Sequence, residues 1–531
     1  MFRKLIRKIK LNNLLNSSNC NANEKNGQGT KSTHTAEIPK EIQGLKNKLQ
    51  DSFNNCSDFV MREITIGKER KQKLLIAFID GLVNKQLINS DILHPLMIEA
   101  ASVEIRNKNV MELIQCQWLN SCEIDEVSDF EQSLDHMLSG DVVIFIEGEK
   151  TGIKVVMRHW DKRSVEQPQT ESVVRGPREG FTETLRTNTS LLRRKIKNKN
   201  LKFETIKVGE QTNTDICLCY IEGIANNEVI STVRERISRI KTDAVLESGY
   251  IEEFIEESAF NIFPTVGNTE KPDIAAAKIL EGRVAIICDG TPFVLTVPYL
   301  FVEAIQSSED YYNRSIYATL SRLVRVLAIF ITTMLPAYYV ALVNYHQGII
   351  PYKLLLTMTA SREGIPFSAL TEALVMVVTF ELLREAGIRM PRAIGQAVSI
   401  VGALVIGDAA VNAGLISSPM VIVIAITAIT SFIVSSLAGT VLIIRIITMI
   451  AANIIGILGI LLVSIAFFIH MCNTRSFGVN YLFPFTPVSV TDLKDTFVRF
   501  PMWAMLTRPK EITWEHGNEA RYRNENPKKG K

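Results

Sequence analysis

Acidic and amide side chains set within apolar segments are the residues of this chain best placed to do chemistry. The segment 366–387, PFSALTEALVMVVTFELLREAG, carries several glutamates and a threonine, and the segment 394–415 carries an aspartate and an asparagine four residues apart. A charge at the centre of a bilayer costs about 2.5 to 3.5 kcal/mol on insertion scales, so an ionisable residue there is a functional hypothesis. The candidates for an ion pathway are Glu372, Thr379, Glu381, Asp408 and Asn412.

Glu372 has two interpretations that the sequence leaves open. On a helix, Ser368, Glu372, Val375 and Thr379 follow one another at four- and three-residue spacing and share a face. A ring of such glutamates from several subunits would attract cations, as acidic rings do in cation channels. Alternatively, Glu372 forms an ion pair with a neighbouring helix or with a partner subunit.

Asp408 and Asn412 also share a helix face, and Asp408 lies past the midpoint of its segment. It therefore either contributes to a polar path or sits near the far headgroups. Small residues recur at four-residue steps along the same segment, which suits close packing of helices in lipid. These packing residues are Ser399, Ala403 and Gly407.

Two other residues interrupt the apolar segments. Pro336 has no backbone N–H, and we expect it to kink its helix. Arg445 lies near the start of its segment, and we expect its long side chain to reach the headgroups.

A charged stretch rich in proline and glycine runs from Arg163 to Glu204. Backbone amides near its glycines could form a nest for an anion, although the phosphate-loop pattern GxxxxGK[ST] is absent. The alternative is a solvated linker between domains. The residues of this linker motif are Arg175, Gly176, Pro177, Arg178 and Gly180.

Catalysis and metal binding find no support in the sequence. The eight cysteines include no CxxC pair, and no His or Cys cluster has the spacing of zinc ligands. Cys217 and Cys219 alternate along a strand-like segment and are expected to pack in a core. The glutamates of IEEFIEES, 251–258, are expected on a solvated or docking surface. We predict no catalytic residue, no metal and no cofactor, and the net charge of +3 gives little reason to expect nucleic-acid binding.

Hydropathy predicts the elements that hold the candidate residues. A helix needs about 20 apolar residues to cross about 30 Å of hydrocarbon. Segment 366–387 is more polar, and we expect an irregular amphipathic helix that lies in the interface, re-enters or lines a wet path. The prediction is a transmembrane domain over 320–470 with this helix and four spans, at 323–343, 394–415, 420–438 and 441–470, followed by a polar tail over 471–531.

Positive charges predict the orientation of the spans. No secretory signal begins the chain, so the soluble region is expected in the cytoplasm. Arginines at 384, 389 and 392 favour an inside loop, and the basic tail also favours the inside. These two cues conflict. With five spans the arginine loop lies inside but the tail lies outside, and with four spans the tail lies inside but the arginine loop lies outside.

The soluble region is predicted to mix helices and strands. The pattern from Ile42 to Leu138, including 71–88, is helical; strands are predicted at 141–148, 152–158, 202–208, 215–223, 283–290 and 292–297, with a helix at 227–242. The predicted fold class is an α+β cytoplasmic region of two mixed α/β subdomains followed by an all-α polytopic membrane domain. Its parts are a disordered or lipid-bound basic arm at 1–45, subdomains at 46–160 and 203–310, and a linker at 161–202.

Several ordered motifs make the chain resemble the A-subunit family of spore germination receptors, the GerA type. The resemblance covers about Asp141 to Pro509 and is carried by EQPQTESVVRGPREGF (166–181), ESGYIEEFIEES (247–258), FPTVGNTEKPD (263–273), QSSEDYY (306–312) and LLREAGIRMPRAIGQAVSIVGALVIGDAAVNAG (382–414). The departures are small: Lys271 stands where the family favours arginine, and Ser368 where it often has proline.

The resemblance implies a subunit in the inner membrane of dormant spores. Such proteins act with a transporter-like B subunit, thought to bind the nutrient, and a lipoprotein C subunit. The A subunit is thought to form a homo-oligomer, plausibly a pentamer, that acts as a ligand-gated cation channel. The alternative is a non-conducting scaffold that anchors and organises the receptor.

Overall fold

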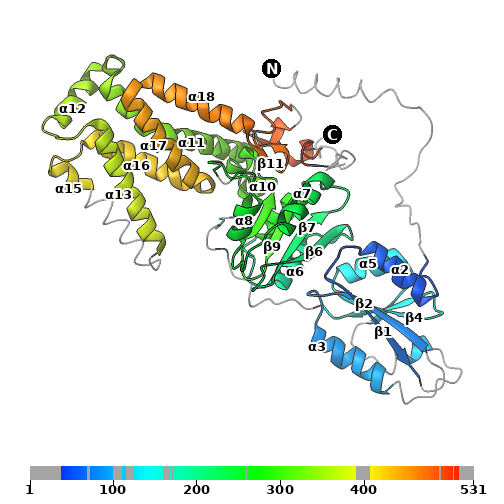
Figure 1. Ribbon diagram of the computed structural model, residues 1–531. Helices are drawn as coiled ribbons and strands as arrows, with labels where there is room; N and C mark the ends of the chain where they lie inside the picture. Colours follow the sequence, from blue (N-terminus) through cyan, green and yellow to red (C-terminus); the bar gives the residue numbers. More distant parts are fainter. Residues whose placement is uncertain are drawn as a thin grey trace, which may run out of the picture.

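The computed structural model arranges the chain in sequence order as a first sheet domain, a second sheet domain and a helical bundle (Figure 1). It describes residues 37–67, 72–99, 110–114, 124–158, 168, 171, 173, 175–258, 260–389, 407–489, 492–505 and 507–513. Mixed α/β structure followed by helices agrees with the predicted order. Residues 1–36 of the predicted arm lie outside the described residues, whereas 37–45 pack in the first domain, with Ile38, Ile42 and Leu45 buried, so the arm ends earlier than predicted.

The first domain is a five-stranded antiparallel sheet in the order β1-β2-β4-β5-β3. Helices α2 (Ile42–Ser52) and α5 (Phe130–Leu138) pack on one face, and the short helices α3 (Lys85–Leu87), η1 (Ile88–Leu93), η2 (Pro95–Glu99) and α4 (Val110–Leu113) lie toward the other. The strands are β1 (Phe59–Ile66), β2 (Gln72–Ile79), β3 (Ile124–Val127), β4 (Asp141–Ile146) and β5 (Gly152–Val156). The predicted hairpin at 141–158 is confirmed as β4 and β5.

The prediction of helical structure over 71–88 is wrong for its first half, because 72–79 form β2, and only its end, from Lys85 on, is helical. Strand β2 lies between β1 and β4, and Leu74 to Ile79 are all buried. A strand buried on both faces is a continuous apolar run, which periodicity cannot distinguish from a buried helix. The helical prediction also missed β1 and β3, because the sequence alone does not show which strands pair with them.

The second domain repeats this plan with the strand order β6-β7-β9-β10-β8. Helices α6 (Leu185–Lys195) and α9 (Pro272–Leu280) cover one face, while α7 (Asn227–Ser238) and α8 (Ser248–Ile255) cover the other. The predicted strands are confirmed, with Cys217 and Cys219 buried on one face of β7. The strands are β6 (Leu201–Val208), β7 (Thr214–Ile221), β8 (Gly267–Thr269), β9 (Val284–Cys288) and β10 (Val294–Val297).

The predicted linker at 161–202 is not solvated throughout. Its second half forms α6, whose Leu191 and Leu192 belong to the core of the second domain. Arg193 of α6 is fully buried and donates to both carboxylate oxygens of Asp58, at 2.9 Å each, just before β1. This part of the chain therefore joins the two domains through a buried ion pair. It contains few apolar residues, and for that reason the sequence predicted a solvated linker.

The helical bundle begins with α11 (Ser315–Asn344), which continues through Pro336. Two of its helices, Ser315–Asn344 and Ser435–Ile455, are long and apolar enough to cross a membrane, as judged over the described residues. The others are α12 (Tyr352–Arg362), α13 (Ala369–Arg389), α15 (Gly407–Asn412), α16 (Ser418–Ile433), α17 (Ala438–Ile455) and α18 (Ile457–Asn473), with the short turns η6 (Gln347–Ile349) and η8 (Ser435–Leu437).

The segment 441–470 was expected to form one span and instead forms two helices. Gly456, with φ of 71° and ψ of −143°, separates α17 from α18. That conformation is open essentially only to glycine. Thr440 at the start of α17 donates to the carbonyl of Ile262, and His470 near the end of α18 lies 3.1 Å from Asn261. The two helices are therefore an antiparallel hairpin whose open end rests on the second domain.

Contacts between helices define two ends of the bundle, a domain-side end and a far end. Thr332 of α11 bonds Thr430 of α16, whereas Tyr339 lies 3.3 Å from Ser417. Helix α16 therefore runs antiparallel to α11, from the far end back to the domain side. Helix α13 runs the same way, since its start meets Ser417 and its Phe380 meets Phe432 at the end of α16.

The described part of the tail returns to the second domain. Strands β11 (Arg475–Ser476) and β12 (Val479–Asn480) form a small hairpin, and Ser476 bonds both Thr265 and the amide of Tyr299. Thr513 bridges Ala225 further on. The turns η5 (Phe301–Ala304), η9 (Leu493–Asp495), η10 (Met502–Ala504) and helix α10 (Glu309–Tyr312) complete this junction. The described part of the predicted tail is thus packed into the junction.

The α17–α18 hairpin should depend on Gly459. A Cβ there would lie 2.3 Å from the carbonyl oxygen of Ala451 in the facing helix. We expect Gly459→Ala to lower the unfolding free energy by about 2 to 4 kcal/mol, because the helices must separate. Gly439→Ala is the control, since nothing lies within 4 Å of its Cβ position. Thermal unfolding of the purified full chain in detergent measures both, and equal midpoints would contradict the close packing.

Candidate functional site

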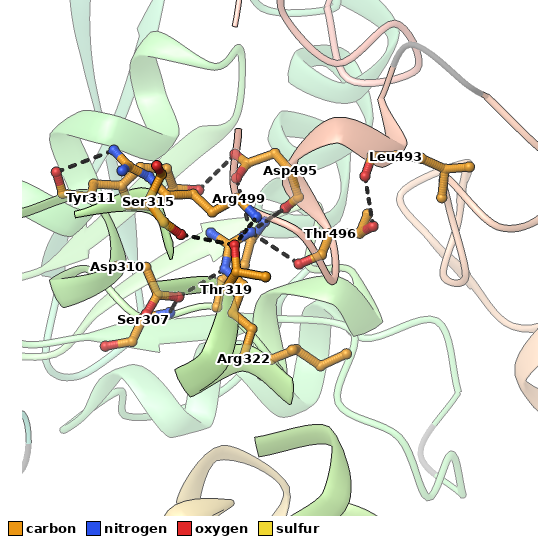
Figure 2. Close-up of polar contacts among 12 residues, drawn as sticks. Ser307, Asp310, Tyr311, Ser315, Thr319, Arg322, Leu493, Asp495, Thr496 and Arg499 are labelled. Carbon is orange, nitrogen blue, oxygen red and sulfur yellow. Dashed lines mark hydrogen bonds and ion pairs between the residues drawn. The ribbon is translucent and has the colours of Figure 1, made fainter. Parts of the chain in front are cut away.

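A group of buried and half-buried charges lies where α10, α11 and the tail meet (Figure 2). We call it the junction cluster; it consists of Asp310, Tyr311, Arg322, Arg325, Asp495 and Arg499. Helix α10 supplies the first two residues, α11 the two arginines that follow, and the tail the last two. Residues nearly two hundred positions apart therefore converge beside the domain-side end of the bundle.

Asp310 is the centre of the junction cluster. Its side chain is 2% exposed and accepts from Arg322 Nε at 2.9 Å and from both Arg325 terminal nitrogens at 2.8 and 2.9 Å. Arg322 is fully buried and also donates from Nη1 to the Asp495 carboxylate at 2.9 Å. Arg322 and Arg325 are three residues apart, so both face the same side of α11. The cluster thus fixes the start of α11 against α10 and the tail.

This cluster contains three guanidinium groups and two carboxylates, and backbone carbonyls accept hydrogen bonds from some of the remaining donors. Arg499 donates to the carbonyls of Asn313 and Tyr311, and Arg322 donates to those of Asp495 and Thr496. Burial raises the pKa of the Asp495 carboxyl, and the charge of Arg322 offsets part of that rise. Burial and then Asp495 raise the pKa of Tyr311 well above its ordinary value, so its hydroxyl remains a donor to Asp495 at 2.8 Å.

Sequence reasoning missed this cluster. Asp310 entered only as part of the motif QSSEDYY, and neither Arg322 nor Arg325 was predicted to be a site residue. Their spacing carries a signal, since an aspartate twelve to fifteen residues before two arginines can fold back across one short turn. Asp495 gives no such signal, because 173 residues separate it from Arg322.

The linker motif lies against the same junction. Gly176 has φ of 147°, and a Cβ there would lie 2.7 Å from the ring of Tyr312. The Tyr312 hydroxyl in turn donates to Asp273. Arg175, Gly176 and Arg178 are exposed, Pro177 is half-buried and Gly180 is buried. The motif thus covers Tyr312, while its use as an anion nest stays a prediction.

Glu372 is buried at the far end of the bundle, with 1% of its area exposed. Its carboxylate accepts from Arg362 of α12 at 3.1 Å and from the amide and hydroxyl of Ser417 at 3.0 and 2.8 Å. The ion pair that we held open as the alternative for Glu372 is therefore present within the chain. Ser368, which shares its predicted face, is exposed.

The other candidates do not gather around Glu372. Glu381 pairs with Arg384 at 2.6 Å, and Thr379 bonds the carbonyl of Val375 within its own helix. Asp408 is exposed and accepts from Asn412 at 3.1 Å, which agrees with their predicted shared face. Of the small-residue ridge, Gly407 is buried near Val421, and Ser399 and Ala403 lie outside the described residues.

Helix α8 carries the first two glutamates of the motif IEEFIEES, and the other two follow its end. Glu253 is exposed, whereas Glu252 is half-buried between Glu247 and Glu256. Burial, followed by the charges of Glu256 and Glu247, raises the pKa of Glu252 to about 7. Among the described residues no three His, Cys, Asp or Glu side chains are grouped to hold a metal ion.

Two sheet domains tied through a buried charge cluster to a bundle of apolar helices define a membrane-associated subunit with a large soluble region. The model of the Bacillus/Clostridium GerA spore germination protein family matches residues 47–511. The chain therefore belongs to the GerA family of spore germination receptor A subunits, and the resemblance given by its motifs is confirmed.

Relatives match over nearly the whole chain. Spore germination protein KA of Bacillus subtilis is 44% identical over 90% of this chain and 87% of its own length. The membrane protein YfkQ of the same organism is 42% identical, covering 91% and 94%. The crystal structure of the N-terminal domain of the GerK3 A subunit of Bacillus megaterium is 32% identical, covering 50% of this chain and 98% of that domain, with a TM-score of 0.41.

Asp310→Asn should destabilise the junction strongly. Removing one partner of a buried ion pair typically costs about 3 to 5 kcal/mol, because the remaining charge stays buried. Glu385→Gln is the matched control, since it breaks an exposed pair with Arg389 worth about 0.3 to 0.5 kcal/mol. The melting midpoint of the full chain in detergent reports both changes. Equal effects of the two variants would show that the junction cluster does not hold the bundle in place.

Glu252→Gln should stabilise the protein at high pH only. The raised folded pKa means that the folded chain binds this proton more tightly, so stability falls as the pH rises from the ordinary value of 4.5 to about 7. After discounting for its partial exposure, we expect a gain of about 1 kcal/mol at pH 8 and none at pH 4.5. Melting curves at the two pH values measure this. Equal changes of the midpoint at the two pH values would refute the assignment.

Proposed function

We propose that this chain is the membrane subunit of a nutrient-sensing receptor in the inner membrane of the spore, and that several copies form a cation channel. It would open when a partner subunit binds the germinant. The family membership supports the receptor role. The single observation that carries the channel proposal is the exposed carboxylate of Asp408, whose one hydrogen-bond partner among the described residues is Asn412 of its own helix, within a bundle of apolar helices.

Six crossings reconcile the two charge cues that conflicted. The crossings would be α11, α13, the segment 394–415, α16, α17 and α18, and the split at Gly456 supplies the additional one. An even number returns the tail to the side of the soluble domains, where Ser476 contacts Thr265. The arginines that end α13 then face the cytoplasm as well, in agreement with the positive-inside rule.

Asp408 is a better candidate for attracting cations than Glu372. Asp408 lies nine residues before Ser417, which marks the far end of the bundle, and its carboxylate is open to a neighbouring copy. A ring of such carboxylates would concentrate cations at one mouth of a shared path. Glu372, Thr379 and Glu381 would then support the helices around that path rather than face it.

Assembly with other chains accounts for apolar side chains that the bundle leaves exposed. On α11 alone, Ile316, Leu320 and Phe330 are 86%, 60% and 54% exposed. Lipid, further copies and the transporter-like B subunit would cover such surfaces. We propose a homo-oligomer, with a pentamer as one plausible size, that also binds the lipoprotein C subunit. We propose no enzymatic activity, cofactor or nucleic-acid partner.

A non-conducting scaffold is the second candidate function. The observation in its favour is that Glu372 is fully paired within the chain. In that case the bundle would only anchor the soluble domains and organise the receptor.

Asp408→Asn tests the two functions against each other. In a channel, the variant should lower cation selectivity or conductance about two- to tenfold, because it removes one carboxylate per subunit from the mouth. The measurement is ion flux through the receptor reconstituted with its partner subunits in vesicles. Glu385→Gln, which removes an exposed carboxylate from the other end of the bundle, is the control.

A wild-type receptor that binds nutrient and passes no ions would overturn the channel and favour the scaffold. Equal conductance and selectivity in wild type and Asp408→Asn would leave the channel but remove Asp408 from its path. Glu372→Gln should instead reduce stability, because one of the two carboxylate oxygens that accept from Arg362 and Ser417 becomes an NH2 donor and the ion pair is lost.

A further inference from the structure

Arg445 is buried in the helical bundle instead of reaching the headgroups as its sequence position suggested. It lies seven residues into α17, about 10 Å along the helix, and is 2% exposed. A buried guanidinium needs acceptors for its donors, and this position faces α11 and α13. The identity of those acceptors shows what the arginine does.

The first acceptor is the carbonyl of Thr332 in α11, which Arg445 Nε reaches at 2.9 Å. That carbonyl lies four residues before Pro336. In a helix it would accept from the amide of residue 336, and proline has no N–H to give. Helix α11 nevertheless continues through this position. Arg445 therefore supplies the hydrogen bond that Pro336 removes from α11.

The second partner, through charge and not through a hydrogen bond, is Glu381 of α13. Its Oε1 lies 3.8 Å from Arg445 Nη1, while its other oxygen pairs with Arg384 at 2.6 Å. Oε1 is buried and has no hydrogen-bond partner in the part of the chain that the structure describes. The attraction between Glu381 and Arg445 is thus a loose ion pair, which a small movement of α13 would tighten or break.

We propose that Arg445 is a positioning residue that joins the Pro336 site of α11 to α13 and so holds α13 in its resting position. One end of α11 is fixed to the soluble domains by the junction cluster, and Thr332 lies ten residues beyond Arg322 on the same helix. A displacement of α11 would move the Thr332 carbonyl and, with it, Arg445. The movement of Arg445 would tighten or break its pair with Glu381 of α13. The link itself does not depend on the proposed channel.

A double-variant experiment tests the carbonyl link. Arg445→Met should lower the melting midpoint of the full chain in detergent by roughly 2 to 6 °C, because it leaves the Thr332 carbonyl unsatisfied. Adding Pro336→Ala should recover most of that loss, since the amide of residue 336 can then donate to Thr332. If the changes in melting midpoint of the two substitutions simply add, the link to α11 is overturned.

Hydrogen exchange tests the link to α13. In Arg445→Met, amides of 380–389 and of 330–335 should exchange several times faster, whereas those of α18 should keep the wild-type rate. A general loss of stability would instead raise exchange in all the helices, and that result would overturn the positioning role. Arg445→Lys, which keeps the charge but not the fork of donors, should show an intermediate rate. Arg389→Met is the control, because Arg389 is exposed and paired within its own helix.

Spores carrying Arg445→Met provide a functional readout. If α13 is released, these spores should lose ions without nutrient, and Arg389→Met spores should not. If exchange in α13 is faster but the variant spores stay dormant, the link is supported and its control of ion release is contradicted. Unchanged exchange in α13 would overturn the link whatever the spores do, so its failure is distinguishable from failure of the channel.

Discussion

Buried guanidinium groups are the constraint on which the arrangement of this chain depends. Arg193, Arg322 and Arg445 are each almost fully buried, and each joins elements that are far apart in the sequence. A buried ion pair adds little net stability, because desolvation offsets most of the attraction. An unpaired buried charge is costly, however, so only arrangements that supply the partners are allowed. These arginines therefore specify geometry more than they add stability.

The three arginines connect the regions in series. Arg193 joins the second domain to the first through Asp58, and Arg322 joins α11 to α10 and to the tail. Arg445 joins α11 to α17 and α13. Helix α11 takes part in two of these connections and is the common rigid element. Coupling between distant sites requires an element with two arrangements, and the loose pair between Arg445 and Glu381 is suited to that role.

Chain direction in the bundle follows from one glycine. Gly456 turns an apolar run of 30 residues, 441–470, into a hairpin, because its backbone conformation excludes side chains and ends α17. Gly459 then allows α18 to approach the carbonyl of Ala451. This additional reversal brings the tail back to the second domain, where Asp495 completes the junction cluster. The position of a buried carboxylate thus depends on a turn at the opposite end of the bundle.

The sequence by itself determined the family, the soluble and apolar regions, the strands of the second domain other than β8, and the shared face of Asp408 and Asn412. These features depend on composition, local motifs and short-range periodicity, which neighbouring residues carry. Tertiary structure decided that β2 is a strand, that Glu372 meets Arg362 and Ser417, and that Asp310 meets two arginines. Those outcomes depend on which distant groups become neighbours. A buried charge needs a partner, and only the folded structure determines which group that partner is.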